Sequence, residues 1–226
     1  CTLTALLMAI GAVGHVAVRA LGPRYGYAVG AIASGFASST VTIAAMGQAV
    51  AKEPNHLRTL AAAAIFSNVA TMAQAGLILG TVAPALLVKM AWPLLAGLVT
   101  AVLYGMGLML RTGAVPASQT LEVGGAFDLK LALLMVLMLT GITFVSSVML
   151  YHFGQVGVML TATVSGFADA HASTASIAAL ATSGQLSLDA AAIPILLAIS
   201  CNSVSKCLVA WVSGGRRFAV YVIAGQ

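Results

Sequence analysis

Charged residues are scarce in this sequence and make up only 7% of its 226 positions. A water-soluble domain typically carries charges at about a quarter of its positions. Hydrophobic residues account for 61% of the chain, and the mean hydropathy is +1.05. Because so few charges cannot cover a surface that faces water, the sequence predicts that most of the surface faces the lipid bilayer.

The sequence also lacks the motifs of soluble enzymes and nucleic-acid-binding proteins. The three cysteines, Cys1, Cys201 and Cys207, stand in apolar surroundings without Cys-x-x-Cys or Cys/His spacing, so we expect reduced, structural thiols. The ten Lys and Arg residues are scattered, mostly at the ends of apolar runs, where they anchor helices at lipid headgroups. No basic patch with interleaved aromatics exists, so nucleic acid is not an expected partner. No cofactor and no catalytic nucleophile with an oriented base are predicted, and we expect no enzyme activity.

What the sequence has in abundance is long apolar runs. A membrane-spanning helix needs about 20 mainly apolar residues, and runs of that length are separated here by Gly, Pro and charged residues. They predict seven or eight membrane elements over residues 3–21, 25–50, 57–81, 84–110, 129–151, 155–181, 186–212 and from 218 onward. The chain has no initiating Met and stops soon after the last run begins, so we expect a segment of a longer protein with a truncated C-terminus.

A polar motif inside these apolar runs occurs twice. Residues 34–42 read SGFASSTVT and residues 165–174 read SGFADAHAST, at an offset of 131 positions. An Asn-bearing helix follows each motif; Asn68 and Asn202 are 134 positions apart, a drift that the intervening connection absorbs. Internal repeats of this kind are typical of transporters.

The sequence therefore predicts an all-α, polytopic membrane protein made of two homologous repeats with interrupted helices. The first repeat covers residues 1–110, residues 111–128 form a linker, and the second repeat covers residues 129–226. The positive charges of the loops show no bias to one side. Parallel and inverted repeats therefore both stay open.

Both motifs predict a helix that is broken inside the membrane. Gly35 and Gly166 are expected to permit the bend, and Ser38 and Asp169 then stand where an N-cap residue would accept backbone hydrogen bonds. The N-terminus of a helix inside the membrane presents the positive end of its dipole, and two such ends would form a site for an anion or polar solute. Carbonyls freed by the break would instead suit a cation.

Polar and ionisable side chains inside membrane spans are costly and usually functional. Lys206 is the only Lys deep in a predicted span, and we predict that it pairs with Asp169. The same side chains have structural interpretations as caps, bonds to the preceding turn or interhelical contacts. The predicted site consists of Asp169, His171 and Lys206, which would bind or relay charge, and of the neutral ligands Ser38, Thr40, Thr42, Asn68, Ser173 and Asn202. No metal is assigned, since a Mg²⁺ site usually takes more than one carboxylate.

At these motifs the chain resembles a membrane domain of unknown function numbered 4010, often found C-terminal to an MgtC/SapB-type domain. The residues that carry the resemblance are 35–40 and 42, 166–172 and 176, 202–206, and 214–218. The chain departs from the family at Met46-Gly47-Gln48, where members often carry an Arg. The resemblance implies a multi-pass protein of the bacterial inner membrane with an MgtC-like domain or partner, and it implies no particular activity.

The leading functional prediction is a transporter or channel for a small ion or solute, with its site at the interface of the two repeats. Two other classes stay open: a non-transporting regulatory or scaffold subunit, and an enzyme acting on a lipid-linked substrate with Asp169 and His171 as acid and base. A water-accessible cavity at Asp169 favours transport or catalysis, a dry centre favours the scaffold, and a lateral opening to lipid beside His171 favours the enzyme. A homodimer is left open.

Overall fold

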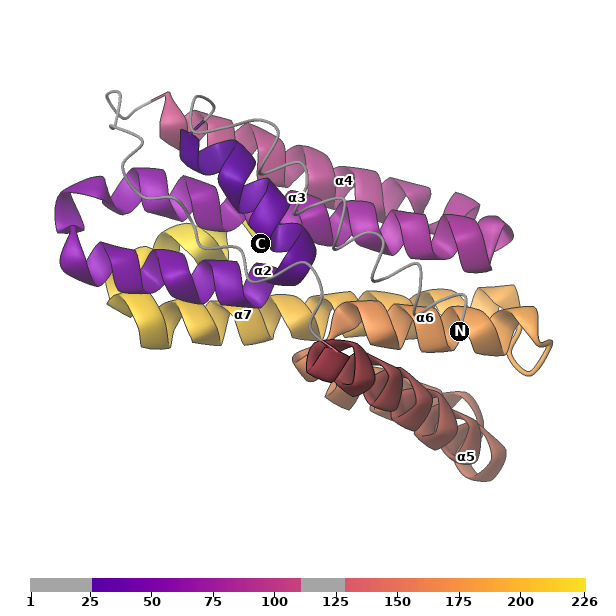
Figure 1. Ribbon diagram of the computed structural model, residues 1–226. Coiled ribbons are helices and arrows are strands. Elements are labelled where there is room, and N and C mark those ends of the chain that lie inside the picture. The colour runs from indigo at the N-terminus through magenta and orange to yellow at the C-terminus, as the bar shows by residue number, and fades with distance from the viewer. Residues whose placement is uncertain (1–25, 111–128) are drawn as a thin grey trace. The chain divides into compact units, whose positions relative to one another are not determined.

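The computed structural model describes residues 26–110 and 129–226, and all regular secondary structure in them is helical (Figure 1). The elements are α2 (Gly26–Lys52), the short 3₁₀ helix η2 (Pro54–His56), α3 (Leu57–Val82), α4 (Pro84–Met109), α5 (Leu129–Ala168), α6 (Ala170–Thr182) and α7 (Leu188–Ala224). This confirms the all-α prediction for the described part of the chain. The predicted helix over residues 3–21 and the predicted linker over residues 111–128 lie outside the described residues.

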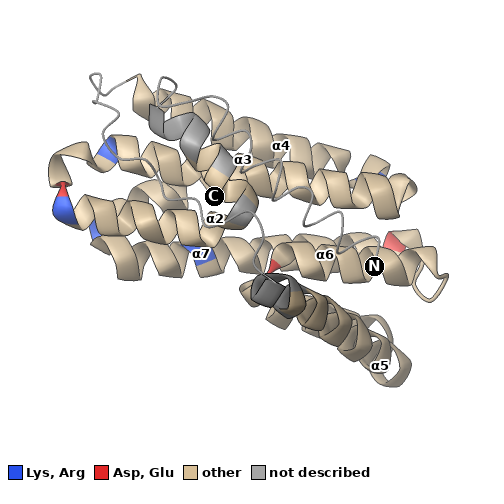
Figure 2. Ribbon diagram, viewed as in Figure 1, with Lys and Arg blue, Asp and Glu red and all other residues tan. Residues whose placement is uncertain are grey.

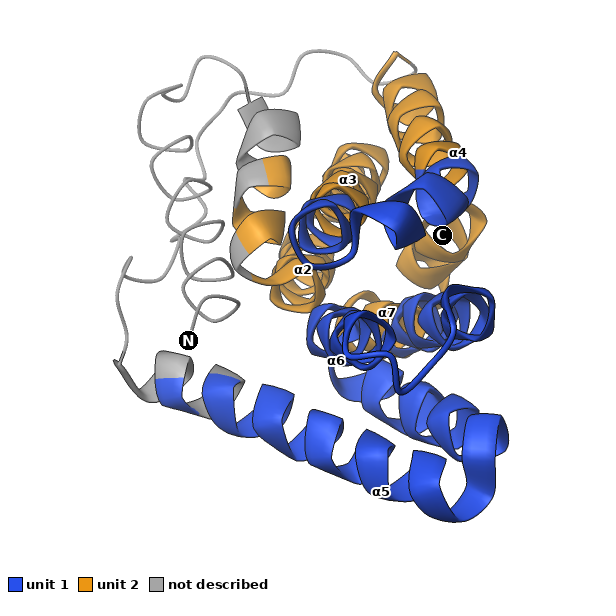
Figure 3. Ribbon diagram, turned by 90° about the vertical axis from the view of Figure 1, so that its right-hand side faces the viewer, with its two compact units in different colours: residues 1–8, 74–94, 127–205 blue, residues 9–73, 95–126, 206–226 orange. Residues whose placement is uncertain are grey.

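Three of these helices contain a residue with non-helical backbone angles. α2 is broken at Ser38 (φ −165°, ψ 110°), α5 at Gly154 (φ 61°, ψ −145°) and α7 at Gly215 (φ 73°, ψ 179°). The two glycines adopt positive φ values that are costly for residues with a Cβ atom. α5 changes direction along its path (Figure 3), which agrees with its break at Gly154.

Among residues 26–110 and 129–226, four helical stretches are long and apolar enough to cross a bilayer. They are Pro54–Val82, Pro84–Met109, Val136–Ala168 and Leu188–Ala224. Large apolar side chains point outward on these helices, for example Val88 at 74% exposure and Leu137 at 70%. Figure 2 shows how few charged positions interrupt the described helices. The chain is therefore a helical membrane protein whose exposed apolar side chains suit a lipid environment.

The chain divides into two compact units, coloured in Figure 3. Unit 1 comprises residues 1–8, 74–94 and 127–205, and unit 2 comprises residues 9–73, 95–126 and 206–226. These units differ from the predicted halves of the sequence, because α3, α4 and α7 each contribute one part to each unit. The boundaries of the two compact units therefore do not coincide with those of the predicted sequence repeats.

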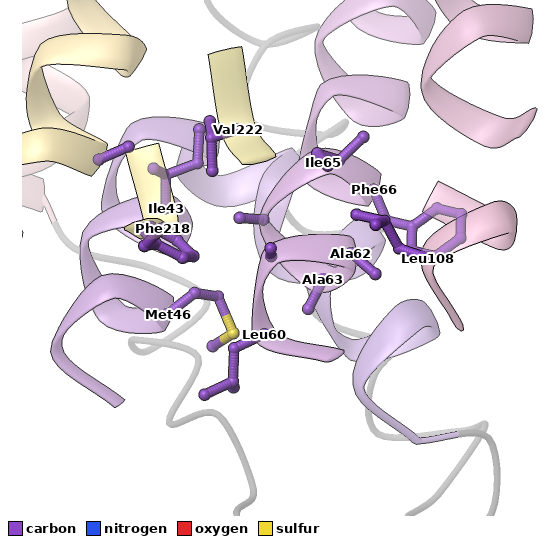
Figure 4. Packing of buried hydrophobic residues seen from close by; sticks show 14 of the residues in the cluster. Ile43, Met46, Leu60, Ala62, Ala63, Ile65, Phe66, Leu108, Phe218 and Val222 are labelled. Carbon is purple, nitrogen blue, oxygen red and sulfur yellow. The ribbon is translucent and has the colours of Figure 1, made fainter. Parts of the chain in front are cut away.

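The core of unit 2 is built on small side chains of α3. Ala61, Ala62, Ala63 and Ala64 are all 0% exposed, and larger residues of α2 and α7 pack around them (Figure 4). The larger members of this cluster include Ile43, Met46, Phe218 and Val222. Since lipid tails are as apolar as the side chains, helices in a membrane associate chiefly through close van der Waals packing, which small residues allow. The run of alanines thus sets the close approach of the helices in unit 2.

In unit 1, α5 and α6 pack against each other, and an ion pair joins α4 to the first turn of α7. Lys89 Nζ donates to Asp189 Oδ1, with the two side chains 38% and 91% exposed. Exposed pairs of this kind contribute little to stability. An exposed pair of this kind suits a position at a membrane–water interface.

Candidate functional site

The chain is interrupted at Asp169, between α5 and α6. Asp169 has extended backbone angles (φ −158°, ψ 119°) that any residue adopts. Its Oδ1 accepts the backbone N–H of His171 at 3.0 Å, and its Oδ2 accepts that of Ala172 at 3.0 Å. This confirms the predicted N-cap, and a carboxylate also suits the positive end of the helix dipole.

The imidazole of His171 lies against the same carboxylate. Its Nδ1 is 2.9 Å from Asp169 Oδ1. Residues two apart do not face each other on a continuous helix, so the contact exists because the helix is broken at Asp169. The other ring nitrogen, Nε2, is buried and has no hydrogen-bond partner among the described residues. Asp169 therefore orients the ring and leaves Nε2 for another ligand.

Ser173 lies one turn after Asp169 and is 0% exposed. Its hydroxyl is 2.7 Å from the carbonyl oxygen of Asp169 and 2.8 Å from Ser165 Oγ. Ser173 therefore ties the first turn of α6 to the end of α5. Its role in this structure is to position the interruption.

The break in α2 at Ser38, in unit 2, has the same local form. The backbone N–H of Val41 donates to Ser38 Oγ at 3.3 Å, which confirms the predicted cap. Thr42 Oγ1 is 2.9 Å from the carbonyl oxygen of Ser38 and 3.0 Å from Ser34 Oγ. Thr42 thus makes the same two bonds around Ser38 that Ser173 makes around Asp169.

The glycines of the two motifs have a different role from the predicted one. The non-helical residues are Ser38 and Asp169, three positions later, and neither Gly35 nor Gly166 has a positive φ. A Cβ atom on Gly35 would lie 2.8 Å from the carbonyl oxygen of Ser67, and one on Gly166 would lie 2.5 Å from that of Ala198. These glycines permit close backbone packing against α3 and α7 rather than the bend itself.

Lys206 lies in a polar cluster inside unit 2. It is 1% exposed, and its Nζ donates to Asn68 Oδ1 at 3.0 Å and to Thr71 Oγ1 at 2.9 Å. Thr71 Oγ1 in turn donates to Ser39 Oγ at 3.0 Å. The structure therefore brings together two predicted residues, Lys206 and Asn68, that are 138 positions apart in the sequence.

Sequence reasoning missed Thr71 and Ser39 as members of this cluster. Thr71 follows Asn68 by three positions and shares its helix face, which was a usable signal. The predicted partner of Lys206, Asp169, belongs to unit 1, so that pairing stays a prediction. Thr40 is half-buried in unit 2 and Asn202 is 5% exposed in unit 1, and neither takes part in the bonds described here.

Two further buried hydroxyls lie on α6. Thr174 and Ser176 are both 0% exposed, and Thr174 Oγ1 and Ser176 Oγ have no hydrogen-bond partner among the described residues. Hydroxyls in membrane helices usually bond to a carbonyl of the preceding turn, as Thr182 does to Ala178 at 3.1 Å. His171 and Thr174 are three positions apart and share one face of α6, whereas Ser176 lies on another. His171 Nε2 and Thr174 Oγ1 thus give α6 a polar face that suits water or a polar solute.

Within residues 26–110 and 129–226, no group of three or more His, Cys, Asp or Glu residues is placed to hold a metal ion. In unit 1 the interruption at Asp169 offers hydroxyls, an imidazole and one carboxylate, and in unit 2 the residues around the break at Ser38 and Lys206 offer hydroxyls, an amide and one ammonium. Each set by itself suits hydrogen bonding to a small solute.

The family model for the Domain of unknown function (DUF4010) matches residues 5–214 of the chain. The protein belongs to the DUF4010 family. The match includes both interrupted helices and Lys206, so the candidate site lies within the DUF4010 domain. A stretch of 104 residues is 29% identical to an uncharacterized protein of Aquifex aeolicus (strain VF5), covering 46% of this chain and 45% of that protein. The chain thus aligns with less than half the length of that relative. No solved structure matches.

Proposed function

We propose that this DUF4010 protein transports or channels a small ion or solute across the membrane. Its binding elements would be the helix interruptions at Ser38 in α2 and at Asp169 between α5 and α6. The observation that carries the proposal is the helix interruption at Asp169, with buried polar atoms around it. Unpaired backbone and side-chain polar groups are expensive in a bilayer and occur where they line a water-filled cavity or bind a solute. Interrupted helices at a solute site are a recurrent feature of transporters.

The proposal includes two homologous repeats, supported by local geometry at a constant offset. Ser38 and Asp169, the residues at the breaks, are 131 positions apart. The hydroxyl bonds of Thr42 recur for Ser173 at the same offset. Since these bonds depend on backbone geometry, their recurrence supports common descent of the two halves.

The close glycine contacts follow the same offset. Gly35 packs against Ser67 and Gly166 against Ala198, and both members of the pair shift by 131 positions. Position 202 then corresponds to Thr71, so the correspondence of Asn68 with Asn202 expected from the sequence does not hold in this register. The constant offset of 131 positions aligns the two halves without the drift of three residues that pairing Asn68 with Asn202 required.

We further propose the bacterial inner membrane as the location. An MgtC-like domain or partner and a homodimer are retained as proposals that the family resemblance and the repeat architecture motivate.

The proposal is tested by flux into proteoliposomes across a panel of cations, anions and neutral solutes, each with and without a pH gradient. We expect flux of at least one solute by the wild-type protein, and loss of that flux to the level of protein-free liposomes in Asp169→Asn. The matched control is Asp189→Asn, which removes an exposed carboxylate of α7 and should leave flux unchanged. Absence of flux for every solute, with correctly folded protein, would instead indicate a regulatory or scaffold subunit.

A further inference from the structure

The polar cluster around Lys206 carries an inference about the kind of solute. Its members are Lys206, Asn68, Thr71 and Ser39, all within unit 2 and all at most 5% exposed. Lys206 belongs to one of the stretches that are long and apolar enough to cross the bilayer. A charged residue at such a depth is costly and usually marks a functional site.

The amide of Asn68 is oriented by the ammonium. Its Oδ1 accepts a hydrogen bond from Lys206 Nζ at 3.0 Å, which leaves the Nδ2 end of the amide directed elsewhere. An amide NH₂ group only donates hydrogen bonds. Nδ2 has no acceptor among the described residues, and Asn68 is only 3% exposed. A buried donor without an acceptor is costly, and an acceptor supplied by a ligand would remove that cost.

The hydroxyls of the cluster also donate away from the ammonium. Lys206 donates to Thr71 Oγ1, and Thr71 donates to Ser39 Oγ. Ser39 is the first residue after the break in α2, at the start of the helical segment that runs to Lys52. The first peptide N–H groups of such a segment lack intrahelical acceptors and form its positive end.

We propose that this cluster binds a small anion, with Lys206 supplying the charge and Asn68 Nδ2 donating a hydrogen bond to it. The ammonium and the amide NH₂ present donors only, and the cluster contains no carboxylate of its own. Among the described residues of unit 2 the single acidic residue is Glu53, which lies after the end of α2 and bonds to His56. The claim that the bound anion is also the transported solute rests on the proposed transport function.

The test is anion binding to the purified protein in detergent, measured by isothermal titration calorimetry. Chloride, nitrate, phosphate and acetate are titrated as sodium salts at constant ionic strength, with gluconate as the balancing anion. We expect saturable binding of at least one of them. Asn68→Asp places a carboxylate beside Lys206 and removes the free donor, so binding should weaken by at least about tenfold while the fold is kept.

Two comparisons make this result specific. Lys206→Met removes the charge but keeps an unbranched apolar side chain, and it should also lose binding; Asn68→Asp keeps the inference testable if Lys206→Met fails to fold. Asn55→Asp is the control, since it makes the same chemical change at an exposed Asn of η2, outside the cluster, and should bind as wild type does. Wild-type protein that binds none of the four anions would overturn the inference, as would Asn68→Asp that binds them unchanged.

Flux measured on the same preparations separates this inference from transport itself. Anion binding without flux would support the anion site and contradict the transport function. Cation flux without anion binding would contradict the anion site and leave transport standing.

Discussion

Gly166→Ala is expected to lower the melting temperature of the detergent-solubilised protein strongly, whereas Gly141→Ala in the same helix should leave it unchanged or raise it slightly. A Cβ atom at position 166 would lie 2.5 Å from the carbonyl oxygen of Ala198 and 2.7 Å from its Cα atom. Both are backbone atoms of α7, so relief of the overlap requires the two helices to move apart. Overpacking against backbone atoms lies at the upper end of the usual range, about 3 kcal/mol, or about 6–12 °C in a chain of this length.

The control at Gly141 tests the same chemical change without the overlap. A Cβ atom there would meet no atom within 4 Å, and Ala is favoured over Gly inside a helix by about 1 kcal/mol. Gly35→Ala in α2 should behave like Gly166→Ala, because its Cβ atom would lie 2.8 Å from the backbone of Ser67. Equal melting temperatures for Gly166→Ala and Gly141→Ala would show that α5 and α7 do not approach as closely as described.

Asp169→Ala is expected to destabilise the protein by about 2 kcal/mol, at the upper end of the range for loss of an N-cap. The substitution removes acceptors for the backbone N–H groups of His171 and Ala172 and for the imidazole. Asp169→Asn keeps one acceptor oxygen and should lie between wild type and Asp169→Ala. The measurement is thermal melting of the three proteins in one detergent.

Ser38→Ala provides the comparison within the other interrupted helix. Its cap is a single bond of 3.3 Å to Val41 N–H, so the expected loss is only about 0.5 kcal/mol. The ranking of the effects, Asp169→Ala well above Ser38→Ala, follows from the number and charge of the bonds lost. A larger effect at Ser38 than at Asp169 would contradict this account of the two caps.

The sequence was sufficient to predict most of the helices and both interruptions, because their signals are local. Pro84 and Leu57 were predicted as helix starts, and both are the first residues of observed helices. The caps at Ser38 and Asp169 depend only on side chains that reach the next turn of the same chain. The break at Gly215 falls within the Gly- and Arg-containing interruption that separated two predicted helices.

The contacts that define the site were harder to predict because they join distant parts of the chain. The bonds of Lys206 reach residues 138 and 135 positions away, and helical periodicity does not specify which partner a buried side chain meets. The role of Gly166 was missed for the same reason, since its closest neighbour is the backbone of Ala198. The unpartnered state of Thr174 depends on its rotamer, which sequence patterns do not determine.

The central claim is that the polar face of α6 formed by His171 and Thr174 is reached by water, and thiol labelling tests it most directly. In protein lacking Cys1, Cys201 and Cys207, a cysteine is introduced at Thr174 and exposed to a charged, membrane-impermeant methanethiosulfonate reagent in proteoliposomes. Ala172→Cys is the negative control, because Ala172 is only 4% exposed and is neither three nor four positions from His171 or Thr174. Ser183→Cys, at the exposed end of α6, is the positive control. We predict that Thr174→Cys is labelled and that Ala172→Cys is not. Labelling at Ser183→Cys alone would contradict the claim and show that the interruption at Asp169 is a dry structural feature.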